Sequence, residues 1–457
     1  MKVIADIEAN GLKPDQIFCI VCKEHESGKI HKFVDKRWNT EYPSLEDFDE
    51  FSKGVTHWVF HNGLGYDLPV LKRLRGLNVT IPNQTDTLVL SRLFGCLREI
   101  PKGVKSAHSL EAWGLRLKFE KDHYDQWEYY EQEMLDYCVK DVEVLHKTYN
   151  YLMREGKGYS EFSIKLEYET TLVLREQQTT GWYIDERKAM VLHAELTTRA
   201  KEIEDVIESE FLPLPKYIKE VVPKINKDGT MSVVGLKFLG EQMENVGGPL
   251  SRIKWQLFDL NSPTQKVQRL EGYWDPYIKT PAGSWKLCEE NLSTVHDNAP
   301  SGLKLLAEYA MVSSRYRMVE NWLDNTWGDS RVHGRVISVG SATHRMAHQS
   351  PNSANIPSHG PYGKECRELW TVEDTRTRRI CGVDAAGIQL RMLAHYMNDK
   401  DYIEAVCHGD IHETNLEAMG IDKGILLPDG THEARPTAKT FIYAYLLGAG
   451  DAKAGQI

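Results

Sequence analysis

Strand-like and helix-like segments alternate along the first 158 residues, and this alternation limits the possible folds more than any other feature of the sequence. KVIADIEA, QIFCIVCKE and THWVFHN have the composition of strands, whereas EMLDYCVKDVEVLHKTYNYLM is typical of a helix. Such alternation favours an α/β domain. The segment EGKGYS, at 155–160, predicts a linker, so we expect the first domain to cover 1–158.

The rest of the sequence predicts two further parts. Helices are expected at 164–178, 186–210 and 303–327. Prolines and glycines interrupt the pattern between 211 and 300, which indicates an irregular insertion. VHGRVISVG and RRICGVD have the character of strands, and helices follow them. We therefore expect a second part at 159–330, with an insertion at about 211–255, and a third at 331–457.

Composition is compatible with a protein of several folded domains. The 457 residues are 41% hydrophobic, which argues against disorder, and no apolar run approaches the length of a membrane span. The net charge of −10 does not exclude nucleic acid, because acidic metal sites and basic grooves can be segregated. Cys19 and Cys22 form a CxxC, but their strand-like context favours two reduced cysteines over zinc or redox chemistry.

Acidic residues recur in an order that suits metal-dependent chemistry. Asp6 and Glu8 lie two apart on the opening strand, so both carboxylates point from one face. Asp67 ends HNGLGYD, and Tyr137 and Asp141 are one helical turn apart. Like charges placed side by side are costly unless cations bind between them. Four acidic groups around two Mg²⁺ ions supply what phosphodiester hydrolysis requires.

Each of these pieces is common by itself, since a D-x-E pair is usually solvated and Y-x-x-x-D occurs on many helices. Their order is far more specific, and it resembles the three motifs of the DnaQ-like 3′–5′ exonucleases. The resemblance implies a ribonuclease H-like fold for 1–158. It also implies that the four carboxylates are metal ligands and that Tyr137 orients the attacking water.

A second group of residues lies in the last quarter of the sequence. Arg435, Lys439 and Tyr443 recur every fourth residue in RPTAKTFIYAYLLGAG, which keeps them on one face of a helix. Two cations followed by an aromatic ring suit a triphosphate with a base attached. Asp384 follows the expected strand RRICG, and Gly387 then permits a tight turn into a helix. Taken alone, this is an ordinary strand-to-helix junction capped by Asp384.

Together with Arg345 in ATHRMAHQSPNSANIP, these residues resemble the family A (DNA polymerase I-like) DNA polymerases, and among them the replicative polymerases of T-odd bacteriophages. The resemblance runs in collinear order over nearly the whole chain and includes GDIH, AKTFIY and GAGD. It implies an α+β polymerase right hand, with palm, thumb and part of the fingers, behind the exonuclease domain. It also implies DNA replication in the cytoplasm of an infected bacterial host.

The resemblance implies binding roles for individual side chains. Arg435, Lys439 and His412 would hold the triphosphate of a dNTP, and Tyr443 would stack beside its sugar and base. Arg345 would contact the minor groove of primer–template DNA, where acceptor atoms are shared by all base pairs. Taken alone, His412 is better explained as a buried structural histidine.

The polymerase metal site shows two departures from the family pattern. Asp384, with the backbone carbonyl of Ala385, would bind two Mg²⁺ ions. Gln389 stands where the family has a Glu that packs under the sugar, which puts the rejection of ribose in doubt. The later H-D-E motif, which supplies another carboxylate, does not occur before Ile457. We therefore expect the N-terminal portion of a polymerase, truncated before that motif and completed by a second fragment that carries it.

The expected insertion matches the place where phage polymerases recruit thioredoxin as a processivity factor. A basic loop there could slide along phosphates without reading sequence, and a plain loop with solvated lysines explains the charges equally well. The basic residues are Lys216, Lys219, Lys224, Lys227, Lys237, Arg252 and Lys254. We therefore expect either a loop that binds a thioredoxin-like partner or a plain surface loop with solvated lysines.

Three functions are compatible with these sequence features. The favoured one is a DNA polymerase with 3′–5′ proofreading exonuclease activity, acting on primer–template DNA, single-stranded DNA and dNTPs, with no membrane partner. A stand-alone exonuclease with a polymerase-like remnant is the second, although a remnant has no need of a triphosphate-binding helix. A non-catalytic DNA-binding assembly subunit is the third, and the intact acidic set opposes it.

Overall fold

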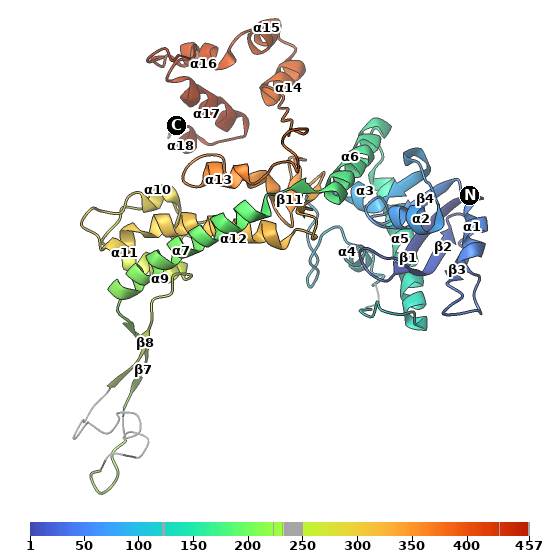
Figure 1. The fold of residues 1–457 in the computed structure, drawn as a ribbon, viewed down its shortest axis with the longest axis horizontal. Coiled ribbons are helices and arrows are strands. Elements are labelled where there is room, and N and C mark those ends of the chain that lie inside the picture. The colour runs from blue at the N-terminus through green and yellow to red at the C-terminus, as the bar shows by residue number, and fades with distance from the viewer. Residues whose placement is uncertain (121–123, 223, 231, 233–249, 429, 456–457) are drawn as a thin grey trace. The chain divides into compact units, whose positions relative to one another are not determined.

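The structure is a computed structural model that describes all residues except 121–123, 223, 231, 233–249, 429 and 456–457. The chain divides into two compact units, a large unit, Met1–Arg378, and a small unit, Arg379–Ile457 (Figure 1). Within the described residues, no helix has both the length and the apolar character that crossing a membrane requires. The finer division into three parts stays a prediction.

A five-stranded sheet lies at the centre of the N-terminal part of the large unit. Its order is β3-β2-β1-β4-β5, and its strands are β1 (Lys2–Ala9), β2 (Ile17–Glu24), β3 (Ile30–Val34), β4 (His57–Phe60) and β5 (Gln84–Asp86). β1 pairs antiparallel with β2 and parallel with β4, so the strand that carries Asp6 and Glu8 is in the middle of the sheet. The three strands expected here are confirmed. Cys19 and Cys22 are free and buried within β2.

Helices pack on both faces of this sheet, because consecutive residues of β1 point to opposite sides. Val3 belongs to one apolar cluster with Phe48 of α1, and Ile4 belongs to the other with Leu145 of α5. The helices of this part are α1 (Leu45–Ser52), α2 (Asp67–Arg75), η1 (Ile81–Asn83), α3 (Thr87–Phe94), α4 (Leu110–Arg116) and α5 (Gln132–Glu155).

A helical region continues the large unit. The helix expected at 186–210 is confirmed as α7 (Glu186–Glu210), and it packs along α12 (Leu306–Asp324) through residues such as Leu196 and Val312. The helix expected at 303–327 is interrupted, since α11 (Ser301–Lys304) ends just before α12 begins. The other elements are α6 (Glu161–Thr180), β6 (Trp182–Tyr183), α9 (Pro263–Leu270), α10 (Glu289–Leu292), β9 (Arg331–Val332), η2 (Ser353–Asn355) and α13 (Gly363–Glu368).

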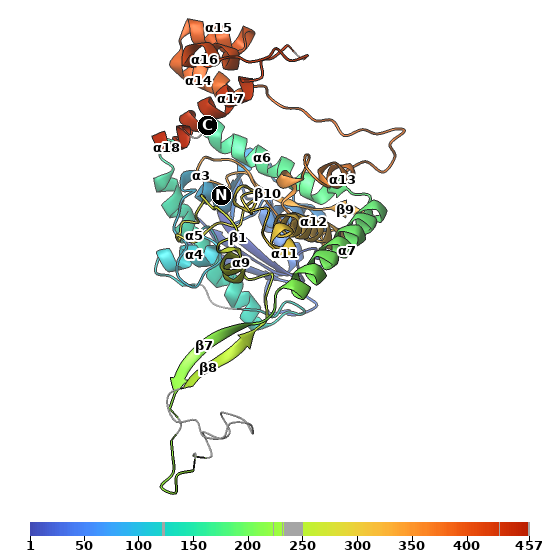
Figure 2. The ribbon, with the colours of Figure 1, turned by 90° about the vertical axis from the view of Figure 1, so that its left-hand side faces the viewer.

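Two hairpins extend the large unit. β7 (Leu214–Val221) pairs antiparallel with β8 (Leu250–Gln256), and Figure 2 shows this ribbon projecting from the helical region. The prediction of an irregular insertion is therefore wrong for these two strands. Pro215 is tolerated because a two-stranded ribbon consists only of edge strands. Lys237 lies outside the described residues. The second hairpin joins β10 (Arg335–Ile337) to β11 (Ala347–Gln349) and confirms part of the strand expected in VHGRVISVG.

The small unit is helical. It consists of α14 (Ile388–Met397), α15 (Lys400–His408), α16 (Ile411–Met419), α17 (Arg435–Leu446) and α18 (Asp451–Ala454), and its core includes Leu390, Val406 and Ile411. The strand predicted in RRICGVD is wrong: residues 378–384 have no regular structure. A strand requires hydrogen bonds to a neighbouring strand, and within the described residues this apolar run pairs with none.

Candidate functional site

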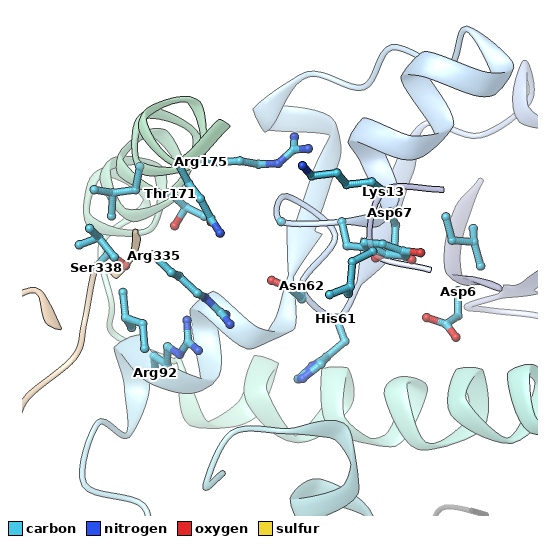
Figure 3. A pocket seen from close by; sticks show the side chains of 18 of the residues that line it. Asp6, Lys13, His61, Asn62, Asp67, Arg92, Thr171, Arg175, Arg335 and Ser338 are labelled. Carbon is cyan, nitrogen blue, oxygen red and sulfur yellow. The ribbon is translucent and has the colours of Figure 1, made fainter. Parts of the chain in front are cut away.

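One cavity in the large unit brings together all five residues of the predicted nuclease motifs. It encloses about 780 Å³ and is lined by Asp6, Glu8, Asp67, Tyr137 and Asp141. Asp6 and Glu8 reach it from β1, Asp67 begins α2, and the other two are one turn apart on α5. Figure 3 shows Asp6 and Asp67 on one side of the cavity. The fold thus gathers residues that are 135 positions apart in the sequence.

The carboxylates of Asp6 and Glu8 are close enough to each other to make a bound cation favourable. One ligand atom each of Asp6, Glu8 and Cys138 lies within 4.8 Å of the others. Burial, and then the charge of Asp6, raise the pKa of Asp67 well above its ordinary value. Both causes disfavour the ionised form of Asp67, and a divalent cation with oxygen ligands would favour it. The donor set therefore fits a hard divalent metal.

Asp86 is a positioning residue that the sequence reasoning missed. Its buried carboxylate accepts hydrogen bonds from the backbone N–H groups of Asn62 (3.1 Å) and Leu64 (3.0 Å), in the turn that leads to Asp67. It also caps α3 by accepting from the N–H groups of Leu88 and Val89. The signal in the sequence was an acidic residue directly before the apolar run TLVLSRLF.

Aromatic side chains surround the tyrosine of the third motif. The ring centroid of Tyr137 is 5.7 Å from that of Tyr124 and 5.9 Å from that of Trp127, and Trp127 also lines the cavity. These contacts restrict the rotamers of Tyr137 on α5. A phenol held next to the carboxylates is suited to hold a water molecule or a phosphate oxygen in a fixed position.

Part of the predicted nucleotide site is assembled in the small unit. The predicted helix is confirmed as α17, where Arg435 donates from Nε to Oδ2 of Asp410 at 2.7 Å. Asp410 also caps α16 by accepting from the backbone N–H of His412. The His412 and Tyr443 ring centroids are 5.9 Å apart. Burial, and then the charge of Arg435, lower the pKa of His412, so its imidazole is neutral at neutral pH.

The remaining predicted residues lie on exposed surface. Lys439 is exposed one turn after Arg435 on α17, and Asp384, Ala385 and Gln389 are exposed in the segment that precedes or begins α14. Within the described residues, Asp384 belongs to no group of three potential metal ligands. Arg345 is exposed in the loop of the β10–β11 hairpin, where its backbone closes the turn with Gly340 and Ser341.

Comparisons with known protein families find one match in the N-terminal part of the chain and another in the C-terminal part. Residues 3–153 match the RNase_H superfamily, and residues 236–456 match DNA polymerase family A. The chain is 29% identical to the DNA-directed DNA polymerase of Enterobacteria phage T3 and 28% identical to that of Escherichia phage T7, in each case over 100% of this chain and 77% of the relative.

More distant relatives match parts of the chain or its fold. DNA polymerase I of Helicobacter pylori strain J99 is 31% identical over 44% of this chain and 21% of the relative. A solved structure of the POL domain of Pol1 from M. smegmatis, in complex with DNA primer-template and dNTP, superposes with a TM-score of 0.65. That match covers 99% of this chain and 69% of the other at 17% identity, so it supports the fold alone.

RNase H-like and family A polymerase domains generally depend on divalent metals, which agrees with the donor set of the cavity. The chain therefore combines an RNase H-like exonuclease domain with a family A DNA polymerase domain, and it is a DNA-dependent DNA polymerase homologous to those of phages T3 and T7.

Proposed function

We propose that the cavity lined by Asp6, Glu8, Asp67 and Asp141 is a 3′–5′ exonuclease site that proofreads single-stranded DNA ends with two Mg²⁺ ions. The observation that carries this proposal is the convergence of four carboxylates from three elements in one cavity. Mg²⁺ prefers oxygen ligands, and when bound it would activate water and stabilise the leaving oxygen. Tyr137, next to the carboxylates, orients the attacking water.

Digestion of a 3′-labelled oligonucleotide tests this site. The double substitution Asp6→Ala, Glu8→Ala is expected to abolish digestion and also to weaken Mg²⁺ binding measured calorimetrically without DNA. Glu133→Gln is the matched control, because Glu133 is an exposed carboxylate on α5 outside the cavity. Normal digestion by the double variant would show that the acidic set is structural.

We propose further that Arg435, Lys439, His412 and Tyr443 bind an incoming dNTP in the small unit. The geometry that supports this is a guanidinium, a neutral imidazole and a phenol gathered at α16 and α17. Asp384 and the carbonyl of Ala385 would hold Mg²⁺, which would supply charge stabilisation for nucleotidyl transfer, and Gln389 would block the 2′-hydroxyl by its bulk. Arg345 contacts the minor groove of primer–template DNA.

Lys439 is the best residue for testing the nucleotide site, because it is exposed and its substitution should not disturb the fold. Arg435, in contrast, is also paired with Asp410. Lys439→Ala is expected to weaken dNTP binding without changing the melting temperature. Lys400→Ala, an exposed lysine on α15, is the control. Equal dNTP affinity of wild type and Lys439→Ala, measured by calorimetry, would contradict the assignment.

Two protein partners complete the proposal. Tyr445 and Leu447 on and after α17 are 65% and 67% exposed, which supports docking against a second fragment that carries the H-D-E carboxylate. Tyr217 and Trp255 on the β7–β8 ribbon are 59% and 62% exposed, which supports a thioredoxin-like processivity factor. Primer extension is measured after adding either partner to the chain. The fragment should raise nucleotide incorporation, and the processivity factor should lengthen the products made per binding event.

A further inference from the structure

Three arginines line the same cavity as the acidic residues but come from other parts of the fold. Arg92 is on α3, Arg175 is on α6, and Arg335 is the first residue of β10. Figure 3 shows their side chains on the side of the cavity opposite Asp6 and Asp67. Only Arg92 lies within residues 3–153, so the wall of the cavity is completed by residues that follow the RNase H-like domain.

The guanidinium groups of Arg92 and Arg175 are held in surroundings that disfavour positive charge. Burial, and then the charge of Arg335, lower the pKa of Arg92 to about 10. Burial also lowers the pKa of Arg175. Among the described residues, however, none of the three arginines forms an ion pair with a carboxylate, whereas other arginines of the large unit, such as Arg75 and Arg98, do.

Cations placed together at a partly buried wall are unfavourable unless an anion binds between them. Arginine matches phosphate in particular, because its planar donors can form two parallel hydrogen bonds to one phosphate group. The proposed scissile phosphate belongs at the carboxylate side of the cavity. The arginine side is therefore placed to receive other phosphates of the same strand.

The cavity also fits unpaired nucleotides. Its volume of about 780 Å³ falls within the range of roughly 300–1,000 Å³ that is usual for ligand pockets. Trp127 lines it, and an aromatic face can stack with a base only when that base is not enclosed in a duplex. The combination of cations that follow the backbone with an aromatic surface is typical of proteins that bind single strands.

We propose that Arg92, Arg175 and Arg335 form a phosphate-binding wall for the single DNA strand whose 3′ end reaches the carboxylates. This inference rests on the proposed exonuclease function and adds that the nuclease site is composite. Arg335 is supplied by the β10–β11 hairpin, the same hairpin whose loop carries Arg345. One short element thus connects the proposed contact to duplex DNA with the binding of the frayed strand.

Binding measured without catalysis is the first test. A 5′-fluorescein oligothymidylate is titrated with the full chain in EDTA at several salt concentrations, and fluorescence anisotropy is read. Each phosphate contact to a single strand contributes a slope of about 0.7 in log K against log salt. Arg335→Gln is expected to reduce the slope by about 0.7 and affinity by roughly 10- to 100-fold, and Arg335→Lys should retain most of the slope.

The matched control is Arg154→Gln, which removes an exposed arginine of α5 outside the cavity and should leave the slope unchanged. Melting curves identify any variant that is misfolded, and Arg92→Gln repeats the test from another element. An unchanged slope in both folded variants, or equal losses in Arg154→Gln, would overturn the inference.

Catalysis provides the second test, with two substrates. The oligothymidylate has many phosphates, whereas the p-nitrophenyl ester of thymidine 5′-monophosphate has only the scissile phosphodiester. Arg335→Gln is expected to raise KM for the oligonucleotide by roughly 10- to 100-fold and to leave cleavage of the ester unchanged. Parallel losses on both substrates would show that Arg335 acts on the chemistry instead. If wild type cleaves neither substrate, the proposed exonuclease fails, while the anisotropy result still decides the phosphate-binding wall.

Discussion

The two candidate sites of this protein are held by different kinds of structure. In the large unit, Asp6 and Glu8 lie on the middle strand of a sheet that is buried on both faces, and Asp67 is itself buried. In the small unit, Arg435 and His412 are organised by helices, but Asp384 is exposed in a segment without regular structure. In the site of the large unit the fold holds the carboxylates in position, whereas in the site of the small unit it holds only the basic residues in position.

This difference shows that a sheet positions carboxylates better than a helix-to-loop junction does. Asp6 and Glu8 both pair with β2, and the start of β1 also pairs with β4, so the direction of the two acidic side chains is fixed. The stability of the buried core covers the cost of bringing the charges together. Asp384 has no such support among the described residues. Variants that inactivate one site, or that weaken its framework, test whether the two sites differ in this way.

Substitutions in the two sites should have the strongest consequences, because each should remove one activity and spare the other. Asp6→Ala should lower nuclease activity on the order of 10³-fold, because metal-ion stabilisation of the transition state is worth several kcal/mol. Asp384→Asn should leave the nuclease unchanged and remove templated incorporation, measured by primer extension. Loss of both activities in either variant would mean that the two sites are not independent.

Asp86→Ala should have the next largest effect, on folding and nuclease activity together. The change removes the cap of α3 and leaves the buried N–H groups of Asn62 and Leu64 without their acceptor. We expect a loss of about 3 kcal/mol in the free energy of unfolding, measured by urea denaturation. Asp86→Asn retains an acceptor and should lose less. Full nuclease activity in a folded Asp86→Ala chain would show that the turn before Asp67 is held by other contacts.

Asp67→Asn is expected to separate stability from activity. The carboxylate of Asp67 is buried close to Asp6, so its neutral isostere should stabilise the metal-free chain, by about 1 kcal/mol. Thermal melting in EDTA measures the gain, and the same variant should be inactive as a nuclease. In saturating Mg²⁺ the order should reverse, because the wild type alone retains its full ligand set. A variant that is less stable in EDTA would contradict the account of buried repulsion.

The smallest effect concerns the framework of the small unit. Burial alone would raise the pKa of Asp410, but hydrogen bonds from Arg435 and from the backbone of α16 outweigh it and lower the pKa. Because the folded pKa is below the unfolded value of about 3.9, the stabilisation is present above that pH and is lost as pH falls further. Asp410→Ala should therefore cost about 1 kcal/mol at pH 7 and almost nothing near pH 2, as measured by chemical denaturation. A difference that does not depend on pH would rule out the ionised carboxylate as its source.

The spacing of apolar residues was sufficient to predict the helices and strands in which that spacing is regular. The helix at 186–210 was predicted with the bounds that the structure has, and the strand that carries Asp6 and Glu8 was expected from its composition. The same spacing predicted strands wrongly where their formation depends on a partner strand. RRICG has the composition of a strand but no described partner, and the β7–β8 ribbon forms although proline and lysine interrupt its apolar pattern.

The order of the residues is enough to show which chemical groups are available and which of them share a strand or a helix face. The D-x-E pair, the tyrosine and aspartate one turn apart, and the four-residue period of Arg435, Lys439 and Tyr443 depend only on local geometry, which a strand or helix imposes on any chain. Which of these groups share a cavity depends on the packing of distant segments. Asp86 supports the turn before Asp67, and Arg335 faces the carboxylates of β1, because packing brings distant segments together in ways that no local period records.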